Sequence, residues 1–197
     1  MTDLPRENVQ FYPRPPALEP VPQRITIRLG GILVADTTRA LRVLETHHAP
    51  TYYLPPADIS ATLQAAPGST FCEWKGTARY FDVIAGATTR RRAAWTYDRP
   101  SARFAPIAGY VAFYAGLMDE VWVGDLRVLP QPGDFYGGWI TPNLEGQIKG
   151  GPGVSRANSS DGRALGRAVP QRAFRKGKPR PCGVVRSRHC RCSGFIA

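Results

Sequence analysis

The sequence predicts a mostly β domain with antiparallel strands and one short helix, spanning about residues 23–153. Short runs that alternate apolar and polar residues recur along it, and Gly and Pro residues interrupt them. The chain has 197 residues, which fits one domain with additional segments at its ends. Of these, 43% are hydrophobic, enough for a core, while the 20 Gly and 19 Pro disfavour a helical protein.

The clearest strand signal follows Arg24, where apolar and polar residues alternate up to Leu29. Gly30-Gly31 comes next and predicts a hairpin turn, because glycine readily adopts the positive φ that both turn positions need. Further strands are expected over residues 32–35, 40–44, 51–54, 70–84, 93–97, 107–114 and 121–128.

One helix is expected over Asp58–Ala66. Ile59 and Leu63 have i, i+4 spacing, the first residue can cap the helix, and a Pro-Gly pair ends it. Residues 1–22 contain six prolines and no apolar periodicity. They predict an extended leader that is ordered only if it lies along the domain.

The net charge of +11 is concentrated at the C-terminal end. Of the 26 basic and 15 acidic residues, eleven basic and one acidic lie in residues 154–197, so residues 1–153 retain 15 and 14. The predicted domain is therefore nearly neutral and lacks the basic surface typical of a nucleic-acid-binding domain. Any contact with nucleic acid is expected to involve the tail alone.

The tail itself, residues 154–197, is predicted to be disordered, because it is poor in aromatic residues and shows no periodicity. Its composition is also that of a shifted reading frame, and we hypothesise that it is a frame-shift product. Its cysteines, Cys182, Cys190 and Cys192, do not have the spacing of a zinc knuckle.

The compartment predicted from the sequence is the cytoplasm, with no membrane partner. The first ten residues are polar and charged, which is unlike a secretion signal. The longest largely apolar run, Phe104–Met118, is too short to cross a bilayer. Three of the four cysteines lie in the last sixteen residues, so they do not form the disulfide framework of a secreted domain.

A series of blocks over about residues 24–153 closely resembles the domain of unknown function 427 family. The Cys-x-Trp-Lys-Gly and Lys-Gly-Gly-Pro-Gly blocks are the most specific. The blocks are Glu45-Thr46 with Pro50, Tyr53 and Pro55; Cys72-Glu73-Trp74-Lys75-Gly76; Trp95-Thr96-Tyr97; Ala108 to Tyr114; Phe135 to Thr141; and Lys149 to Gly153.

The resemblance implies a β-tent (Mss4-like) architecture, in which two antiparallel sheets lean on each other. Many proteins of that shape hold a structural zinc with paired Cys-x-x-Cys knuckles. Cys72 is the only cysteine of the predicted domain, so no such zinc is expected, and no second thiol supports a methionine sulfoxide reductase. The nucleotidyltransferase-like label sometimes given to the family finds no matching motif, since the chain has neither a P-loop nor a Gly-Ser motif followed by Asp-x-Asp.

Two interpretations fit the aromatic residues. On a strand through Cys72, alternation places Trp74 and Tyr80 on one face, and Trp95 and Tyr97 share a face of the next strand. If these faces meet, they form an aromatic recess with a thiol at its edge, suited to a flat or cationic small ligand. Alternatively, the same aromatic side chains fill the core of a small β domain.

The polar candidates leave similar alternatives open. Glu73 and Lys75 are expected on the opposite face of that strand. There they either form a salt bridge with each other or are exposed to solvent. Lys149 lies beside two glycines. Its ammonium and the nearby amides are candidates to bind an anion, or the residue simply belongs to a turn that closes the last strand. Glu45 and His47 share a face if their strand continues, as an acid–base pair or as a surface cluster.

These observations favour a domain that binds an unknown small molecule, with a small-molecule enzyme as the alternative. No motif predicts a cofactor or a metal, and the oligomeric state does not follow from the sequence. The candidate pocket residues are Trp74, Lys75, Tyr80, Trp95, Tyr97, Tyr136, Trp139 and Lys149, and the candidate catalytic residues are Cys72 and Glu45.

Overall fold

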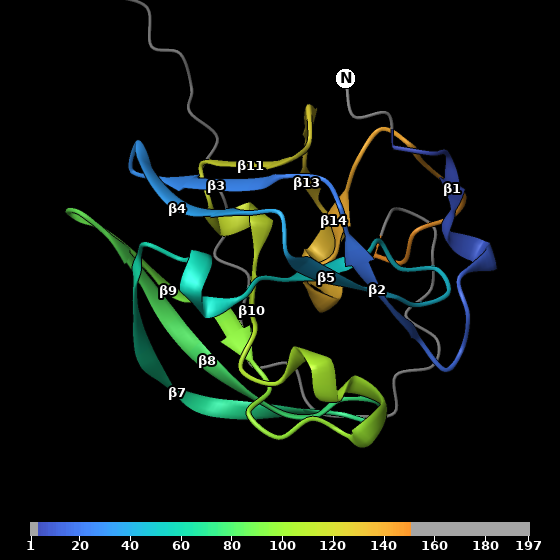
Figure 1. Ribbon diagram of the computed structural model, residues 1–197, viewed down its shortest axis with the longest axis horizontal. Coiled ribbons are helices and arrows are strands. Elements are labelled where there is room, and N and C mark those ends of the chain that lie inside the picture. The colour runs from blue at the N-terminus through green and yellow to red at the C-terminus, as the bar shows by residue number, and fades with distance from the viewer. Residues whose placement is uncertain (1–3, 151–197) are drawn as a thin grey trace, which may run out of the picture. The chain divides into compact units, whose positions relative to one another are not determined.

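The computed structural model describes residues 4–150, which form mainly antiparallel sheets (Figure 1). The predicted mostly β class is confirmed, and the helical segments are short 3₁₀ turns. In chain order the elements are β1 (Glu7–Asn8), η1 (Val9–Phe11), β2 (Ala17–Val21), β3 (Ile25–Leu29), β4 (Ile32–Thr37), β5 (Ala40–Leu44), β6 (Thr51–Tyr53), η2 (Pro56–Asp58), β7 (Thr62–Cys72), β8 (Gly76–Ala85), β9 (Thr88–Thr96), η3 (Ala102–Ile107), β10 (Val111–Phe113), η4 (Ala115–Leu117), β11 (Glu120–Val123), β12 (Leu126–Arg127), β13 (Leu129–Pro130), η5 (Pro132–Gly137), β14 (Trp139–Ile140) and β15 (Leu144–Glu145).

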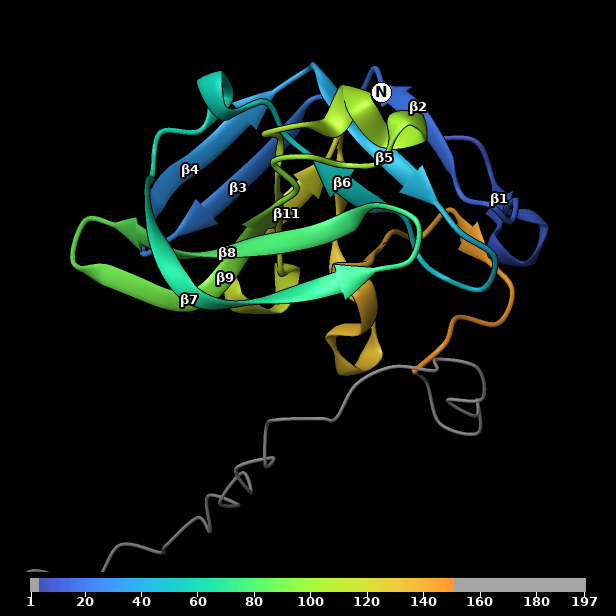
Figure 2. The same cartoon turned by 90° about the horizontal axis from the view of Figure 1, so that it is seen from below.

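One four-stranded sheet has the order β10-β9-β8-β7 and is antiparallel throughout. Figure 2 shows β7, β8 and β9 in front of β3, β4 and β11. The register places Ala66, Tyr80, Trp95 and Ala112 in one row across the four strands. Because directly opposed residues share a face, Tyr80 and Trp95 lie side by side on the same face of this sheet.

A second four-stranded antiparallel sheet has the order β12-β11-β3-β4. Its β3–β4 hairpin turns at Gly30 and Gly31, whose φ angles of 60° and 76° confirm the predicted turn. Thr26 and Arg28 of β3 retain exposure, as the alternation predicts. The buried residues of β3 are Ile25, Ile27 and Leu29.

The first core cluster joins the two four-stranded sheets. Ile27 of β3 and Val121 of β11 belong to the same buried cluster as Val83 of β8 and Phe113 of β10. The two sheets are therefore held together by a shared apolar core. Assignment to the β-tent (Mss4-like) type stays a prediction.

The end of the proline-rich leader forms β2, which belongs to a three-stranded antiparallel sheet of order β2-β5-β6. The beginning of the leader forms β1, which pairs in parallel with β15. Arg42 of β5 fixes both parts, because its guanidinium forms ion pairs with Glu7 at 2.8 Å and Glu19 at 2.9 Å. Residues 4–22 therefore lie along the domain.

The predicted helix over Asp58–Ala66 is wrong. Strand β7 begins at Thr62 and pairs with β8 along its length. The two apolar residues that suggested a helical face belong to different elements: Ile59 forms a bridge to β4, and Leu63 lies within β7. Two residues at i, i+4 spacing do not define a helical stripe when strand pairing satisfies the backbone.

The predicted continuous strand over residues 70–84 is also wrong. The chain turns at Glu73–Lys75, and Cys72 pairs with Gly76 across the resulting β7–β8 hairpin. Gly76 has a φ of 99°, a conformation that residues with a side chain rarely adopt. Trp74 and Lys75 therefore project from a turn and do not alternate along a strand.

Several predictions lie outside the described residues, including the disorder of residues 154–197, the frame-shift hypothesis and the cysteines near the C-terminus. Within residues 4–150, no helix is long and apolar enough to cross a membrane. In the same part of the chain, no group of three His, Cys, Asp or Glu side chains is placed to hold a metal ion.

Candidate functional site

The aromatic candidates meet in a second core cluster. Tyr80, Trp95 and Tyr97 are buried in it, and Trp74 packs against it. Residues of β5, β6 and η3 complete the cluster. The aromatic face thus exists as a contiguous set, and most of its rings are covered by protein.

The β7–β8 turn places the ammonium of Lys75 against this cluster. Lys75 is 8% exposed, and its Nζ lies 5.9 Å from the ring centre of Tyr97 and 5.8 Å from that of Phe104. Ser101 holds the turn by donating its N–H to the Lys75 carbonyl at 3.2 Å and its hydroxyl to the Trp74 carbonyl at 2.6 Å. No residue within 4–150 forms an ion pair or a hydrogen bond with the Lys75 ammonium.

Two buried polar atoms beside this cluster also have no hydrogen-bond partner among the described residues. They are Tyr53 Oη and Trp74 Nε1. The ring of Tyr53 lies 6.3 Å from that of Tyr97, and burial raises the pKa of the Tyr53 phenol well above its usual value. The phenol is therefore a neutral donor at ordinary pH. Buried polar atoms without a partner are rare, so two of them near one unpaired cation mark this part of the molecule.

The leader contributes Arg14 to the rim of the cluster. Its guanidinium lies 5.6 Å from the ring centre of Trp74. It forms ion pairs with Glu73 at 3.1 Å and with Glu45 at 3.6 Å. The buried carboxylate of Glu45 is thus paired with a cation that comes from a distant part of the sequence.

The loop around Tyr136 forms another part of the rim. Tyr136 has a φ of 54°, a strained conformation for a bulky residue, and its side chain remains 50% exposed. Gly137 then packs directly on the ring of Trp95, where a Cβ atom would collide with the indole. Burial raises the pKa of Tyr136, and the nearby Glu45 and Cys72 raise it further.

His48 lies behind this loop in a polar network with Gln131. Gln131 accepts the N–H of Ala49 at 3.0 Å, which directs its Nε2 to His48 Nδ1 at 3.3 Å and to the Lys149 carbonyl at 2.9 Å. Nδ1 is therefore an acceptor, and the imidazole is neutral with its proton on Nε2. Burial, followed by the charges of Lys149 and Lys75, lowers the pKa of His48 to about 3.

Comparison with known families gives one match. Residues 17–124, more than half of the chain, match the family described as a domain of unknown function, DUF427. The chain belongs to the DUF427 family. No curated protein matches it. The DUF427 match contains Tyr53 and Lys75, whereas Arg14 precedes it and Tyr136 follows it.

Not all candidates of this DUF427 chain reach the cluster. Trp139 has no exposed surface; it stacks on Tyr52 at 4.8 Å and donates its Nε1–H to the Phe113 carbonyl at 2.9 Å. It belongs to the first core cluster and presents no face to a ligand.

The suggested acid–base pair of Glu45 and His47 does not form a unit. Strand β5 ends at Leu44, and His47 has a φ of 66° in the turn that follows. Its Nδ1 lies 3.3 Å from the Gln147 carbonyl, while Glu45 engages an arginine. The two side chains therefore have separate partners.

Sequence reasoning missed Tyr53 and Arg14. In the sequence, Tyr53 is one of several apolar residues of a predicted strand, and the neighbouring residues do not indicate that its hydroxyl lacks a partner. Arg14 stands between two prolines in the leader, and this isolated cation is a signal only once the leader is known to lie on the domain. Both depend on contacts between distant parts of the chain.

Proposed function

We propose that the second core cluster forms a recess around Lys75 that binds a small molecule with an anionic or hydrogen-bond-accepting group. The observation that carries this proposal is the Lys75 side chain, which is 8% exposed and holds its ammonium beside two aromatic rings with no acid partner in the described part of the chain. An anionic or hydrogen-bond-accepting group would give this ammonium a partner.

The neighbouring groups support a ligand with acceptors rather than a cation. Tyr53 Oη and Trp74 Nε1 are donors without partners among residues 4–150, and Lys75 repels positive charge. The broader expectation of a flat or cationic ligand therefore narrows to a flat ligand with a carboxylate, phosphate or carbonyl group. Trp74 and Tyr136 retain exposed ring surface at the rim, which suits stacking on a flat ring.

A thermal-shift panel of nucleotides, amino acids, sugars and modified bases tests the proposal on the full chain. At about 100 times its Kd, a ligand should raise the free energy of unfolding by ~2.7 kcal/mol. Lys75→Met keeps the apolar stem and removes the charge, so this gain should vanish. The matched control is Arg103→Met, which removes an exposed cation from η3 and should leave the gain intact.

Two results would contradict this proposal: stabilisation by no class of compound, or equal stabilisation of Lys75→Met and the wild type. Cys72→Ala separates the proposed binding role from the enzymatic alternative. We expect that variant to bind as the wild type does, because the donors named above do not include the thiol. Loss of binding or turnover in Cys72→Ala would instead favour chemistry at sulfur.

We also propose that the protein resides in the cytoplasm. Cys72 is the only cysteine among residues 4–150 and has no disulfide partner there, a pattern more usual in a reducing compartment. Alkylation of intact cells followed by mass spectrometry would measure its oxidation state directly.

A further inference from the structure

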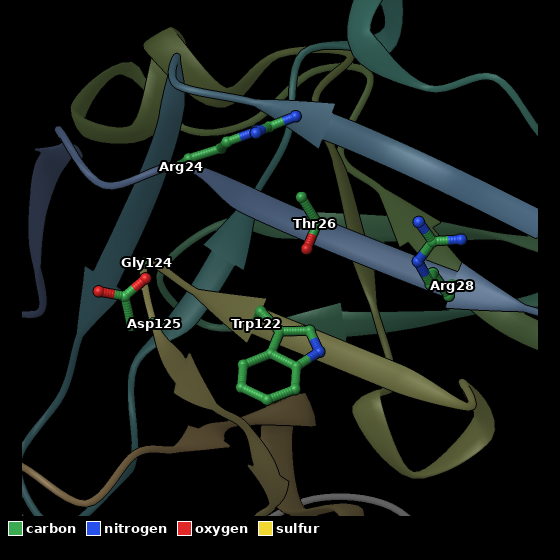
Figure 3. Close-up of a pocket in the computed structure, with 6 residues that line it drawn as sticks. All are labelled: Arg24, Thr26, Arg28, Trp122, Gly124 and Asp125. Carbon is green, nitrogen blue, oxygen red and sulfur yellow. The ribbon is translucent and has the colours of Figure 1, made fainter. Parts of the chain in front are cut away.

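The outer face of the sheet β12-β11-β3-β4 carries an open hollow of about 550 Å³ that is separate from the recess around Lys75. Figure 3 shows Trp122 between Asp125 on one side and Arg28 on the other, with Thr26 on the neighbouring strand. The residues that line the hollow are Arg24, Thr26, Arg28, Trp122, Gly124 and Asp125.

The strand register explains why a tryptophan stands on this outer face. Thr26, Trp122 and Arg127 lie opposite one another on β3, β11 and β12. Their neighbours Val121 and Val123 are buried in the first core cluster, so Trp122 points away from the core. Its indole belongs to neither of the two main clusters and remains partly exposed. The large ring of Trp122 therefore lies on the surface of the sheet and does not contribute to the apolar core.

Polar groups around this ring are only partly satisfied by the protein. Arg24 is bound by Asp36 through two hydrogen bonds. Within residues 4–150, the Arg28 guanidinium donates only to the Gly31 carbonyl, at 3.3 Å, and the carboxylate of Asp125 has no ion-pair partner. The hollow thus offers a donor, an acceptor and an aromatic face at once.

The charge of this face decides which kind of ligand it fits. The arginines and the acids placed here by register and by the hollow balance one another. They are Arg24, Arg28 and Arg127 against Asp36, Glu120 and Asp125. A nucleic acid gains affinity from cations that replace its counterions, and a balanced face offers little of that gain. A neutral ligand with many hydroxyl groups, by contrast, needs donors and acceptors in equal measure.

We propose that this hollow binds a neutral saccharide. The C–H face of a pyranose ring would lie on the Trp122 indole, Arg28 would donate to ring hydroxyls, and Asp125 would accept from them. This site is independent of the recess around Lys75, because it lies on another sheet and uses none of the same residues.

Indole N–H signals in nitrogen-15 NMR spectra of the full chain test the saccharide site. The chain has four tryptophans, and the signal absent from Trp122→Thr identifies Trp122. The probes are cellotetraose, maltotetraose and chitotetraose, with an oligothymidylate at low salt as the competing class. We expect a saturable shift of the Trp122 signal with at least one saccharide and no shift with the oligothymidylate.

Two variants measure the contributions of the ring and the carboxylate. Trp122→Thr should lose saccharide binding while the other three indole signals keep their positions, which shows that the fold is intact. Asp125→Asn should weaken binding by about tenfold, the worth of one charge-assisted hydrogen bond. The site would be overturned by no shift with any saccharide, by unchanged binding in Trp122→Thr, or by a response to the oligothymidylate alone. Lys75→Met should bind saccharide normally, so the two proposals fail separately.

Discussion

The two main core clusters bury large aromatic side chains under different conditions. In the first cluster, Trp139 is fully buried, and its indole N–H is bound by the Phe113 carbonyl. At the second cluster, Trp74 Nε1 and Tyr53 Oη are buried without a partner among the described residues, and the ammonium of Lys75 lies close by. Satisfied polar atoms are typical of a structural core, and the unsatisfied ones at the second cluster are the atoms to which we assign the proposed ligand.

The largest effect that tests this contrast is expected at Trp139. Trp139→Ala should lower the free energy of unfolding by about 3–5 kcal/mol, because it leaves a cavity and an unpaired carbonyl in the first cluster. Urea denaturation followed by circular dichroism measures this loss. The paired variant is Trp74→Ala, whose partly exposed, unbonded indole should cost on the order of 1 kcal/mol or less. Equal losses in the two variants would remove the distinction between the clusters.

A second effect is expected from pH, through His48. Its folded pKa of about 3 lies below the value of about 6.5 in the unfolded chain. Above about pH 6.5 the His48 imidazole is neutral in the folded and in the unfolded chain, so it does not lower the free energy of unfolding. Below that pH the unfolded chain binds a proton at His48 that the folded chain does not. Stability therefore falls as the pH drops from about 6.5 toward 3, by ~2 kcal/mol between about pH 7.5 and 5.

Denaturation midpoints at the two pH values give this difference. His48→Gln should reduce the pH dependence, and the matched control is His47→Asn at the neighbouring turn position, where Asn tolerates the φ of 66°. An unchanged slope in His48→Gln would show that the loss of stability arises from other groups.

A third effect, comparable in size to that of pH, concerns two buried phenols. Tyr12 donates to the Glu7 carboxylate at 2.5 Å, whereas Tyr53 has no partner within residues 4–150. Tyr12→Phe should cost about 1.5–3 kcal/mol, the worth of a hydrogen bond to a charged group, and Tyr53→Phe should cost nothing or slightly stabilise the free protein. Chemical denaturation of both variants compares them. A substantial loss in Tyr53→Phe would mean that its hydroxyl is already satisfied, and the second cluster would then resemble the first.

The sequence was informative about the fold wherever a local pattern decides the structure. Alternation in β3 and the Gly30-Gly31 turn were correct because side-chain period and turn geometry are local properties. The helix expected over residues 58–66 was wrong because pairing of β7 with β8 outweighed a two-residue spacing. The turn at residues 73–75 was missed because its only strong local signal is Gly76.

The candidate site shows the same limit. Lys75, Trp74 and Tyr97 could be named from their residue types and from the family resemblance. That Lys75 lacks an acid partner in the described residues, and that Tyr53 and Arg14 lie around it, depends on how the hairpin, β6 and the leader pack together. No pattern along the chain contains that information, because it depends on which side chains are within reach of one another after folding.

The place of Arg14 in the leader has a consequence for exchanging segments between relatives. Arg14 precedes residues 17–124 of the family match, yet its guanidinium reaches Trp74, Glu73 and Glu45 of the domain. Under the binding proposal, the leader therefore supplies a cation at the rim of a ligand site whose Lys75 lies within the match. We expect exchange of the leader between relatives to change which ligands bind, because it would replace the cation at that rim.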